Sequence, residues 1–288
     1  MSWEDFFEKY HKILSSYSKV KIKIEKFIRD GANVNDKNNH NQTPLHLASN
    51  GGYLEVLKIL IENGANLKVK DNNHYTSLHS AVANNNLEIV KLLLSNGANI
   101  NDIDYDRETP LHLAVKNENL EIAKFLISNG ANVNAKNCYN IISLHIASRK
   151  GNLELVKLLL NNKANINARE KRYNNIPLHE ASQNGHVEVV KVLIENGTDI
   201  NDINIYINTP LHEASRNGHL ESVKMLVQNG AYLKSLNMDD LKPIDLSKNK
   251  EIKEYLSTAT QMMNNHIIYP YFWVVVYNHR LSKSQNKH

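Results

Sequence analysis

Apolar residues in this chain occur in short segments at helical spacing, separated by polar stretches. In segments 54–61 and 153–160, Leu, Ile and Val recur so that their side chains fall on one face of a helix. Stretches 36–42 and 136–141 are rich in Asn, Asp and other turn-forming residues. The pattern predicts helices of about ten residues that each bury one face, with projecting loops, called fingers below, between them.

Glycine and proline punctuate these segments in a constant phase. Glycine after a helix adopts the left-handed conformation that satisfies the last carbonyls, and proline suits the first helical position. Glycines follow each longer segment at Gly31, Gly64, Gly97, Gly130, Gly197 and Gly230, and a shorter one at Gly52, Gly151, Gly185 and Gly218; the shorter segment begins at Pro44, Pro110, Pro177, Pro210 and Pro243. Each unit therefore contains two helices.

The phrase Thr-Pro-Leu-His marks the same phase. It stands at 43–46, 109–112 and 209–212, and its last position falls at His46, His79, His112, His145, His179 and His212, in steps of 33 residues with a single step of 34. Two helices of about ten residues cannot enclose a core, so neighbouring copies must cover each other's apolar faces. The sequence predicts an all-α solenoid.

The period and the motif resemble those of ankyrin-repeat proteins. The resemblance covers about residues 1–256 and implies stacked helix-turn-helix units with projecting β-turn or hairpin loops. Six full repeats are expected at 40–69, 73–102, 106–135, 139–168, 173–202 and 206–235, between a divergent N-terminal capping repeat at 1–39 and a truncated C-terminal one at 239–258. A tail follows at 259–288.

Both ends and one internal repeat depart from the pattern. Trp3, Phe6, Phe7, Tyr10, Ile13 and Leu14 share one helical face near the N-terminus, which predicts a cap, and a short helix at 251–256 is expected to close the other end. In the fourth full repeat, Ile142 and Ser143 replace Thr-Pro, Lys163 takes the place of the closing glycine, and the 34-residue step follows.

The recurring histidines do not predict catalysis or a metal site. In stacked copies they occupy equivalent places in successive layers instead of surrounding one point. We expect each to hydrogen-bond the backbone of a neighbouring loop and so to fix the stacking of repeats. The sequence also has no phosphate-binding loop, nucleophile elbow or cysteine cluster. We therefore expect a protein without catalytic residues, cofactor or metal.

Composition and charge narrow the class of partner. The net charge of +4 comes from the two ends of the chain, so the repeats lack the basic stripe that nucleic-acid binding needs. The acidic N-terminus has no apolar secretory core, no stretch is long enough to span a bilayer, and one cysteine, Cys138, gives no internal disulfide. We expect a monomer in the cytoplasm or in the cytosol of a host.

The resemblance places the variable, partner-binding positions at the finger tips and at the end of the first helix of each repeat. The candidate protein-binding residues are Tyr105, Lys116, Tyr139, Arg149, Lys150, Tyr173, Tyr206 and Arg216. Tyrosine and arginine are common at binding hot spots, so we hypothesise that this set receives an acidic segment of a partner protein. Against it, tyrosine is common at this finger position in the family, and Glu180 and Glu213 dilute the charge.

Three functions and three interpretations of the tail remain open at this point. The expected function is a non-catalytic scaffold or adaptor; the alternatives are a microbial effector or targeting protein that acts on host proteins, and a substrate-presenting subunit of an enzyme complex. The tail contains an apolar aromatic run at 267–276. Three interpretations of this tail are open: it packs over the last repeat, it contacts a partner or a membrane surface, or it is a disordered remnant. We favour packing or the remnant, because Pro270 opposes a regular element.

Overall fold

The computed structural model describes residues 1–11 and 17–264, and within these residues it contains helices and turns but no strand. The chain divides into two compact units, Met1–Cys138 (unit 1) and Tyr139–His288 (unit 2). Each unit is described by itself. The apolar run of the tail lies outside the described residues.

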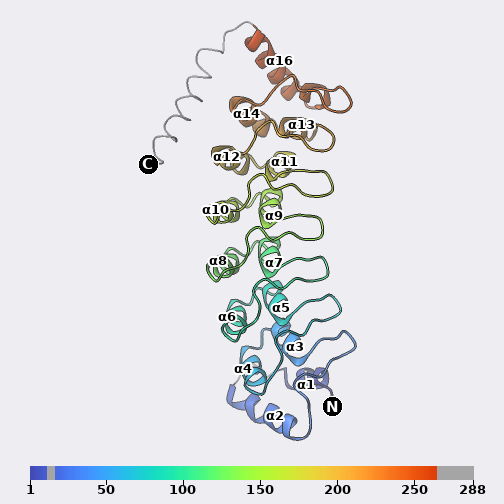
Figure 1. The fold of residues 1–288 in the computed structure, drawn as a ribbon, viewed down its shortest axis with the longest axis vertical. Helices are drawn as coiled ribbons and strands as arrows, with labels where there is room; N and C mark the ends of the chain where they lie inside the picture. The colour runs from blue at the N-terminus through green and yellow to red at the C-terminus, as the bar shows by residue number, and fades with distance from the viewer. Residues whose placement is uncertain (12–16, 265–288) are drawn as a thin grey trace. The chain divides into compact units, whose positions relative to one another are not determined.

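Unit 1 consists of helix pairs stacked in chain order (Figure 1). Along its first column of helices, α3 packs on α5 and α5 on α7; along the second, α2 packs on α4, α4 on α6 and α6 on α8. The helices are α1 (Trp3–Tyr10), α2 (Tyr17–Arg29), α3 (Pro44–Gly51), α4 (Leu54–Glu62), α5 (Ser77–Ala83), α6 (Leu87–Ser95), α7 (Pro110–Lys116) and α8 (Leu120–Ser128).

Unit 2 repeats the same arrangement. α9, α11, α13 and α15 pack in sequence, and α10, α12 and α14 form the second column, with the fingers projecting beyond the first column (Figure 1). The helices are α9 (Ser143–Lys150), α10 (Leu153–Asn161), α11 (Pro177–Gln183), α12 (Val187–Glu195), α13 (Pro210–Arg216), α14 (Leu220–Gln228), α15 (Pro243–Leu246) and α16 (Lys250–Asn264). The predicted solenoid of stacked helix-turn-helix units is confirmed.

The helix ends follow the sequence signals. Pro44, Pro110 and Pro210 stand in the first turn after a threonine N-cap, where a missing amide hydrogen costs nothing. Gly97 adopts a positive φ of 89° after α6, which only glycine does without strain. Lys163 takes the equivalent place after α10 with a φ of 65°, so the fourth repeat keeps the geometry without the glycine.

The core lies between the two columns. Val56, Leu57 and Leu60 on α4 are completely buried, as are Leu155 and Val156 on α10. These residues form the stripe predicted from the helical period. Because each helix pair is too small to enclose this stripe alone, the burial comes from the next pair in the stack.

The N-terminal cap is an aromatic cluster. The rings of Trp3 and Phe27 meet edge to face at 4.9 Å, and Phe6 stacks on Phe27 at 5.1 Å. Trp3 also donates a hydrogen bond from Nε1 to the carbonyl of Asn33 at 2.8 Å. α1 and α2 thus occupy the places that a preceding repeat would fill. The predicted cap residues Ile13 and Leu14 lie outside the described residues.

The C-terminal helix is longer than the sequence pattern predicted. We expected a helix over 251–256 and a tail from 259, whereas α16 continues to Asn264. Ile252, Leu256 and Ala259 are buried along one side of it. The small side chain of Ala259 extends the apolar stripe by a turn, which the prediction from larger apolar residues missed.

Candidate protein-binding site

The fingers are held by hydrogen bonds from their own side chains. The carboxylate of Asp71 accepts from the amides of Asn73 (2.8 Å) and Tyr75 (2.9 Å). In unit 2 the side chain of Asn204 accepts from the amides of Tyr206 (3.0 Å) and Asn208 (3.1 Å). A short side chain with a carbonyl oxygen can close a turn in this way, so the finger tips are ordered before any partner arrives.

Adjacent fingers are also joined through their backbones. In unit 1 the amide of Tyr105 donates to the carbonyl of Asn73 at 3.0 Å. In unit 2 the amide of Ile205 donates to Tyr173 at 2.9 Å, and that of Met238 donates to Tyr206 at 3.0 Å. Each unit therefore presents its fingers as a connected row.

The one extra residue of the 34-residue step lies in a single finger. Glu170 stands where the next finger has Asn204, and its amide bonds the carbonyl of Asn175, five residues on, instead of four. Its longer carboxylate accepts from the amides of Arg172 (2.6 Å) and Asn175 (3.2 Å) and is buried. The extra methylene of glutamate spans the extra residue, so the repeat phase resumes unchanged at His179.

The recurring histidines join successive repeats within each unit. The Nδ1 atom of His46 accepts from the amide of Thr43 at 3.2 Å, so the ring proton must lie on Nε2, which donates to the carbonyl of Tyr75 at 3.0 Å. His79, His145, His179 and His212 reach the next finger in the same way, at 3.0–3.3 Å. The expected hydrogen bonds from these histidines to neighbouring loops are confirmed.

Burial keeps these histidines neutral. It lowers the pKa of His79 and of His179 from 6.5 to about 4, although the carbonyl that each ring donates to acts in the opposite direction. Burial also lowers the pKa of His46, His145 and His212. If Nδ1 were protonated, its hydrogen would face a backbone amide hydrogen, and the imidazolium would place a positive charge in the protein interior. These histidines are structural.

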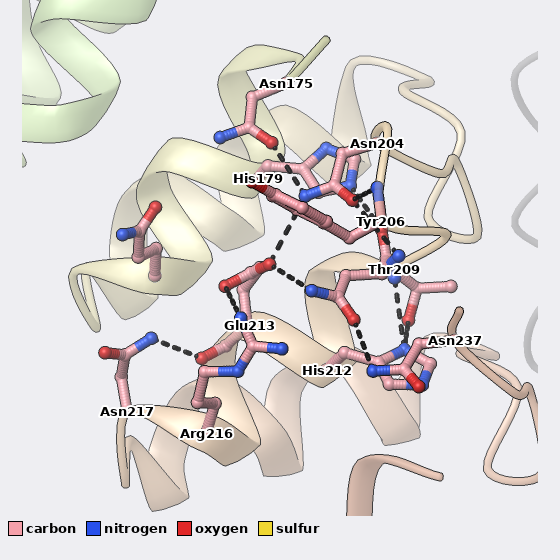
Figure 2. Close-up of polar contacts among 12 residues, drawn as sticks. Asn175, His179, Asn204, Tyr206, Thr209, His212, Glu213, Arg216, Asn217 and Asn237 are labelled. Atoms are coloured by element: carbon pink, nitrogen blue, oxygen red, sulfur yellow. Dashed lines mark hydrogen bonds and ion pairs between the residues drawn. The ribbon is translucent and has the colours of Figure 1, made fainter. Parts of the chain in front are cut away.

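Unit 2 contains a buried network of glutamate and asparagine side chains at the base of its fingers (Figure 2). Glu213, only 5% exposed, accepts from Asn208 at 2.9 Å and from Asn204 at 3.3 Å. Asn204 also donates to Asn175 at 3.0 Å, and Asn237 donates to Asn208 at 3.0 Å. The network links three successive fingers.

Glu180 occupies the same place one repeat earlier. It is 4% exposed and accepts from the Asn175 amide at 3.3 Å and from Nε of Arg149 at 2.8 Å. Arg216 lies 3.7 Å from the carboxylate of Glu213. A buried carboxylate is costly unless a positive charge is paired with it. Each glutamate is paired with an arginine at the end of a short helix, beside the base of a finger.

The predicted basic residues are therefore not free cations. Lys116, in unit 1, pairs with Glu108 at 3.1 Å, and Arg149 and Arg216 pair with the buried glutamates as described. Their side chains nevertheless remain about half exposed, 46% for Arg149 and 42% for Arg216. Lys150 is exposed beside Arg149.

The predicted tyrosines lie at finger tips. In unit 1, Tyr105 is exposed and meets the ring of His74 edge to face at 5.8 Å. In unit 2, Tyr139 and Tyr206 are exposed, and the rings of Tyr173 and Tyr206 lie 6.1 Å apart. Unit 2 thus brings six of the eight predicted residues onto its fingers and first helices, and unit 1 holds Tyr105 and Lys116.

Sequence reasoning missed two features of this region. One is Arg172, whose guanidinium lies 4.8 Å from the ring centre of Tyr173 and adds a cation to the finger tip. The other is the buried network around Glu180 and Glu213. The signal for it was present: glutamate replaces the apolar residue that follows the histidine in three of the four earlier full repeats, such as Leu113, and asparagine appears at Asn175 and Asn208.

In residues 1–11 and 17–264, no group of three or more His, Cys, Asp or Glu side chains is placed to hold a metal ion. Within the same residues, no helix has the length and apolar character needed to cross a membrane.

Comparison with known proteins agrees with the repeat architecture. A family profile described as ankyrin repeats in three copies matches residues 15–104, 72–137, 102–170 and 144–237. The crystal structure of the human ASB11 ankyrin repeat domain is similar at a TM-score of 0.69 and 30% identity, covering 76% of this chain and 98% of that domain.

The ankyrin repeat domain of Bcl-3, a member of the IkappaB protein family, is similar at a TM-score of 0.66 and 28% identity, covering 75% of this chain and 98% of that domain. No curated protein sequence matches the chain significantly. The family match covers most of the sequence, and its repeats are the helix pairs and fingers described above. The chain therefore belongs to the ankyrin-repeat family.

Proposed function

We propose that the protein is a non-catalytic scaffold or adaptor, and that unit 2 binds an acidic segment of a partner protein. Ankyrin repeats are in general protein–protein interaction modules, and they bind through the surface that successive repeats share. The observation that carries the proposal is the pairing of buried Glu180 and Glu213 with half-exposed Arg149 and Arg216. This pairing holds the two guanidinium groups beside the finger bases.

The pairing supports binding because it orients the cations in advance. Arg149 meets Glu180 through Nε, which is a one-point contact, and its terminal amino groups remain suited to a second carboxylate. Lys150, which follows Arg149 in the chain, and Arg172, beside Tyr173, add exposed charge. Tyr139, Tyr173 and Tyr206 supply flat, rigid contact area at low entropic cost. The acidic partner must compete with the buried glutamates, so we expect salt-sensitive binding of moderate affinity.

The test uses peptides selected on the full chain from a random displayed library. We expect the selected peptides to be rich in Asp and Glu. Their affinity, measured by fluorescence anisotropy at about 50 mM and 200 mM salt, should fall at least about tenfold in the double variant Lys150→Glu/Arg172→Glu, since each close charge pair contributes at least about 1.5 kcal/mol. Both side chains are exposed, so the fold should persist.

The matched control is Lys157→Glu/Lys191→Glu, which changes the charge equally on the second helices of the same unit. Its affinity should stay near that of the unchanged protein. Equal affinity for all three proteins, or selected peptides without an acidic excess, would refute the proposed site. The effector and enzyme-subunit alternatives also require this binding step, so the same measurement applies to them.

A further inference from the structure

The last two fingers of unit 2 expose apolar side chains where the preceding finger is polar. We call this surface the apolar finger patch. Its members are exposed isoleucine, leucine and methionine side chains, with 47% exposure at Ile205 and 62% at Met238, and they comprise Ile203, Ile205, Ile207, Leu236, Met238 and Leu241. The hydrogen bond from the amide of Met238 to the carbonyl of Tyr206 makes the two fingers neighbours. An exposed apolar patch of this kind usually marks a contact surface.

Ile207 strengthens this interpretation. It adopts a φ of 57°, a left-handed conformation that a β-branched residue rarely takes. The same conformation is held by Asn140 and Asn174 in earlier fingers, where the asparagine side chain tolerates it. Ile207 therefore costs folding free energy while its side chain stays exposed, which is expected if the side chain packs against something beyond the described residues.

The described chain ends near the segment that leads into the last finger of this patch. The side chain of Asn264, the last residue of α16, accepts a hydrogen bond from Nζ of Lys234 at 2.7 Å, and Lys234 directly precedes the last finger. The apolar aromatic run at 267–276 begins three residues later. An extended chain covers about 3.3–3.6 Å per residue, so the run can lie from about 10 Å to about 40 Å beyond Asn264. Because the two fingers are hydrogen-bonded to each other, a segment that reaches one of them lies next to the other.

The charges beside the apolar finger patch are opposite in sign to those that follow the apolar run in the sequence. Asp239 and Asp240 are exposed at the tip of the last finger, between Met238 and Leu241, and neither forms an ion pair within the described residues. The segment after the apolar run carries Arg280, Lys283 and Lys287 and no acidic residue. An apolar run followed by cations thus matches an apolar patch next to carboxylates.

We propose that the segment 267–276 of the same chain covers the apolar finger patch, with the basic residues after it meeting Asp239 and Asp240. A tethered segment is present at an effective concentration of the order of millimolar, so even a weak contact is populated ahead of a second copy or a partner. The inference goes beyond the proposed function and does not depend on it. Tyr206 of the proposed site lies on a finger of the patch, whereas Arg149, Lys150 and Tyr173 lie on other fingers and helices.

Tryptophan fluorescence tests the proposal directly, because the chain has two tryptophans, Trp3 and Trp273. The Trp3→Phe variant leaves Trp273 as the reporter. We expect its emission to be blue-shifted and protected from acrylamide relative to the urea-unfolded protein. The substitution Ile205→Asp combined with Met238→Asp should shift the emission to the red and raise the quenching constant at least about twofold.

A matched control replaces Ile22, an exposed isoleucine of α2 in unit 1, by Asp and should leave the Trp273 signal unchanged. Because Trp3 is buried in the N-terminal cap, the Trp273→Phe protein supplies the signal of Trp3 for subtraction if Trp3→Phe weakens the cap. The protected signal must occur in a monomer, as measured by light scattering, and must not change between about 0.5 and 50 μM protein.

Three results would overturn the proposal. The first is a Trp273 signal that is already fully exposed in the native monomer. The second is a protected signal that the Ile205 and Met238 substitutions leave unchanged, which would place the segment elsewhere. The third is protection that appears only at high concentration or on addition of anionic phospholipid vesicles, which would assign the segment to a second copy or to a membrane surface.

Discussion

The neutral histidines predict that each unit loses stability in mild acid. Burial lowers the pKa of His79 in unit 1 and of His179 in unit 2 from 6.5 to about 4. Between these two pH values the unfolded chain binds a proton that the folded chain does not, so the free energy of unfolding falls as the pH falls. Above pH 6.5 this contribution is fully present, and below about pH 4 no more is lost.

The magnitude follows from linkage. One such histidine changes the free energy of unfolding by about 1.4 kcal/mol per pH unit, or on the order of 3 kcal/mol across the whole window. His46, His145 and His212 act in the same direction, because burial lowers the pKa of each. Each unit should therefore lose at least about 1.4 kcal/mol per pH unit, a large fraction of the stability of a typical domain.

Buried carboxyl groups act in the opposite direction. Burial raises the pKa of Asp104 and of Asp202 above 3.8, so the folded protein takes up these protons first and gains stability as the pH falls toward that value. This gain is confined to the acidic end of the range. The change in the free energy of unfolding between pH 6.5 and pH 5 should therefore come from the histidines.

Urea unfolding at pH 7.5, 6.5, 5.5 and 4.5, followed by circular dichroism, measures this change. The His179→Gln variant should be less stable at pH 7.5. The change in its free energy of unfolding with pH should be smaller for unit 2, by about 1.4 kcal/mol per pH unit, because one titrating group is gone. The exposed His40, replaced by Gln, is the control and should leave the pH dependence unchanged. A free energy of unfolding that stays constant from pH 7 to pH 5 would refute the argument.

Three further predictions concern single side chains, all measured by urea unfolding. Glu213→Ala should cost about 2–4 kcal/mol, because the buried amides of Asn204 and Asn208 lose their acceptor; Glu213→Gln should cost less, since an acceptor oxygen remains. Ile207→Asn, made in the chain ending at Asn264 so that the tail cannot contribute, should stabilise by about 1 kcal/mol through relief of the left-handed strain. Lys163→Gly should stabilise by a similar amount for the same reason.

Each of these substitutions has a control and a contradicting result. A Glu213→Ala protein as stable as the original would show that the network contributes nothing to folding. Ile207→Val and Lys163→Ala keep the strained backbone without glycine or asparagine, so neither should stabilise. If they stabilised as much as Asn and Gly do at these positions, the strain would not be the cause.

Much of the fold was predictable because its signals are local. Pro210 can begin a helix and Gly97 can end one for steric reasons that hold within a few residues. The constant phase of His179 and His212 then predicted contacts between successive repeats, and these contacts are present at 3.0 Å and 3.2 Å. The end of α16 was missed since the small Ala259 carries the buried stripe where a pattern of larger apolar residues had stopped.

The candidate site was only partly predictable. The sequence suggested Tyr206, Arg149 and Arg216 as binding residues, a hypothesis that remains a proposal, and it treated Glu180 and Glu213 as charges that dilute a basic surface. In the structure both glutamates are buried and hold the arginines. Glu213 lies three residues from Arg216, and Glu180 lies thirty-one residues from Arg149. Nothing in the sequence near either glutamate indicates that it is buried, because its surroundings come from neighbouring repeats.

What the sequence determined by itself is the repeating unit: where the helices of each full repeat begin and end, the face that each buries, and the stacking of each copy on its neighbours. These features depend on backbone sterics and helical period, which act over a few residues. The tertiary structure alone decided that Asn175, Asn204 and Asn208 would surround two carboxylates, and that the apolar finger patch would stay uncovered by the repeats. Burial and exposure depend on side chains about thirty residues apart, which only the stacking of repeats brings together.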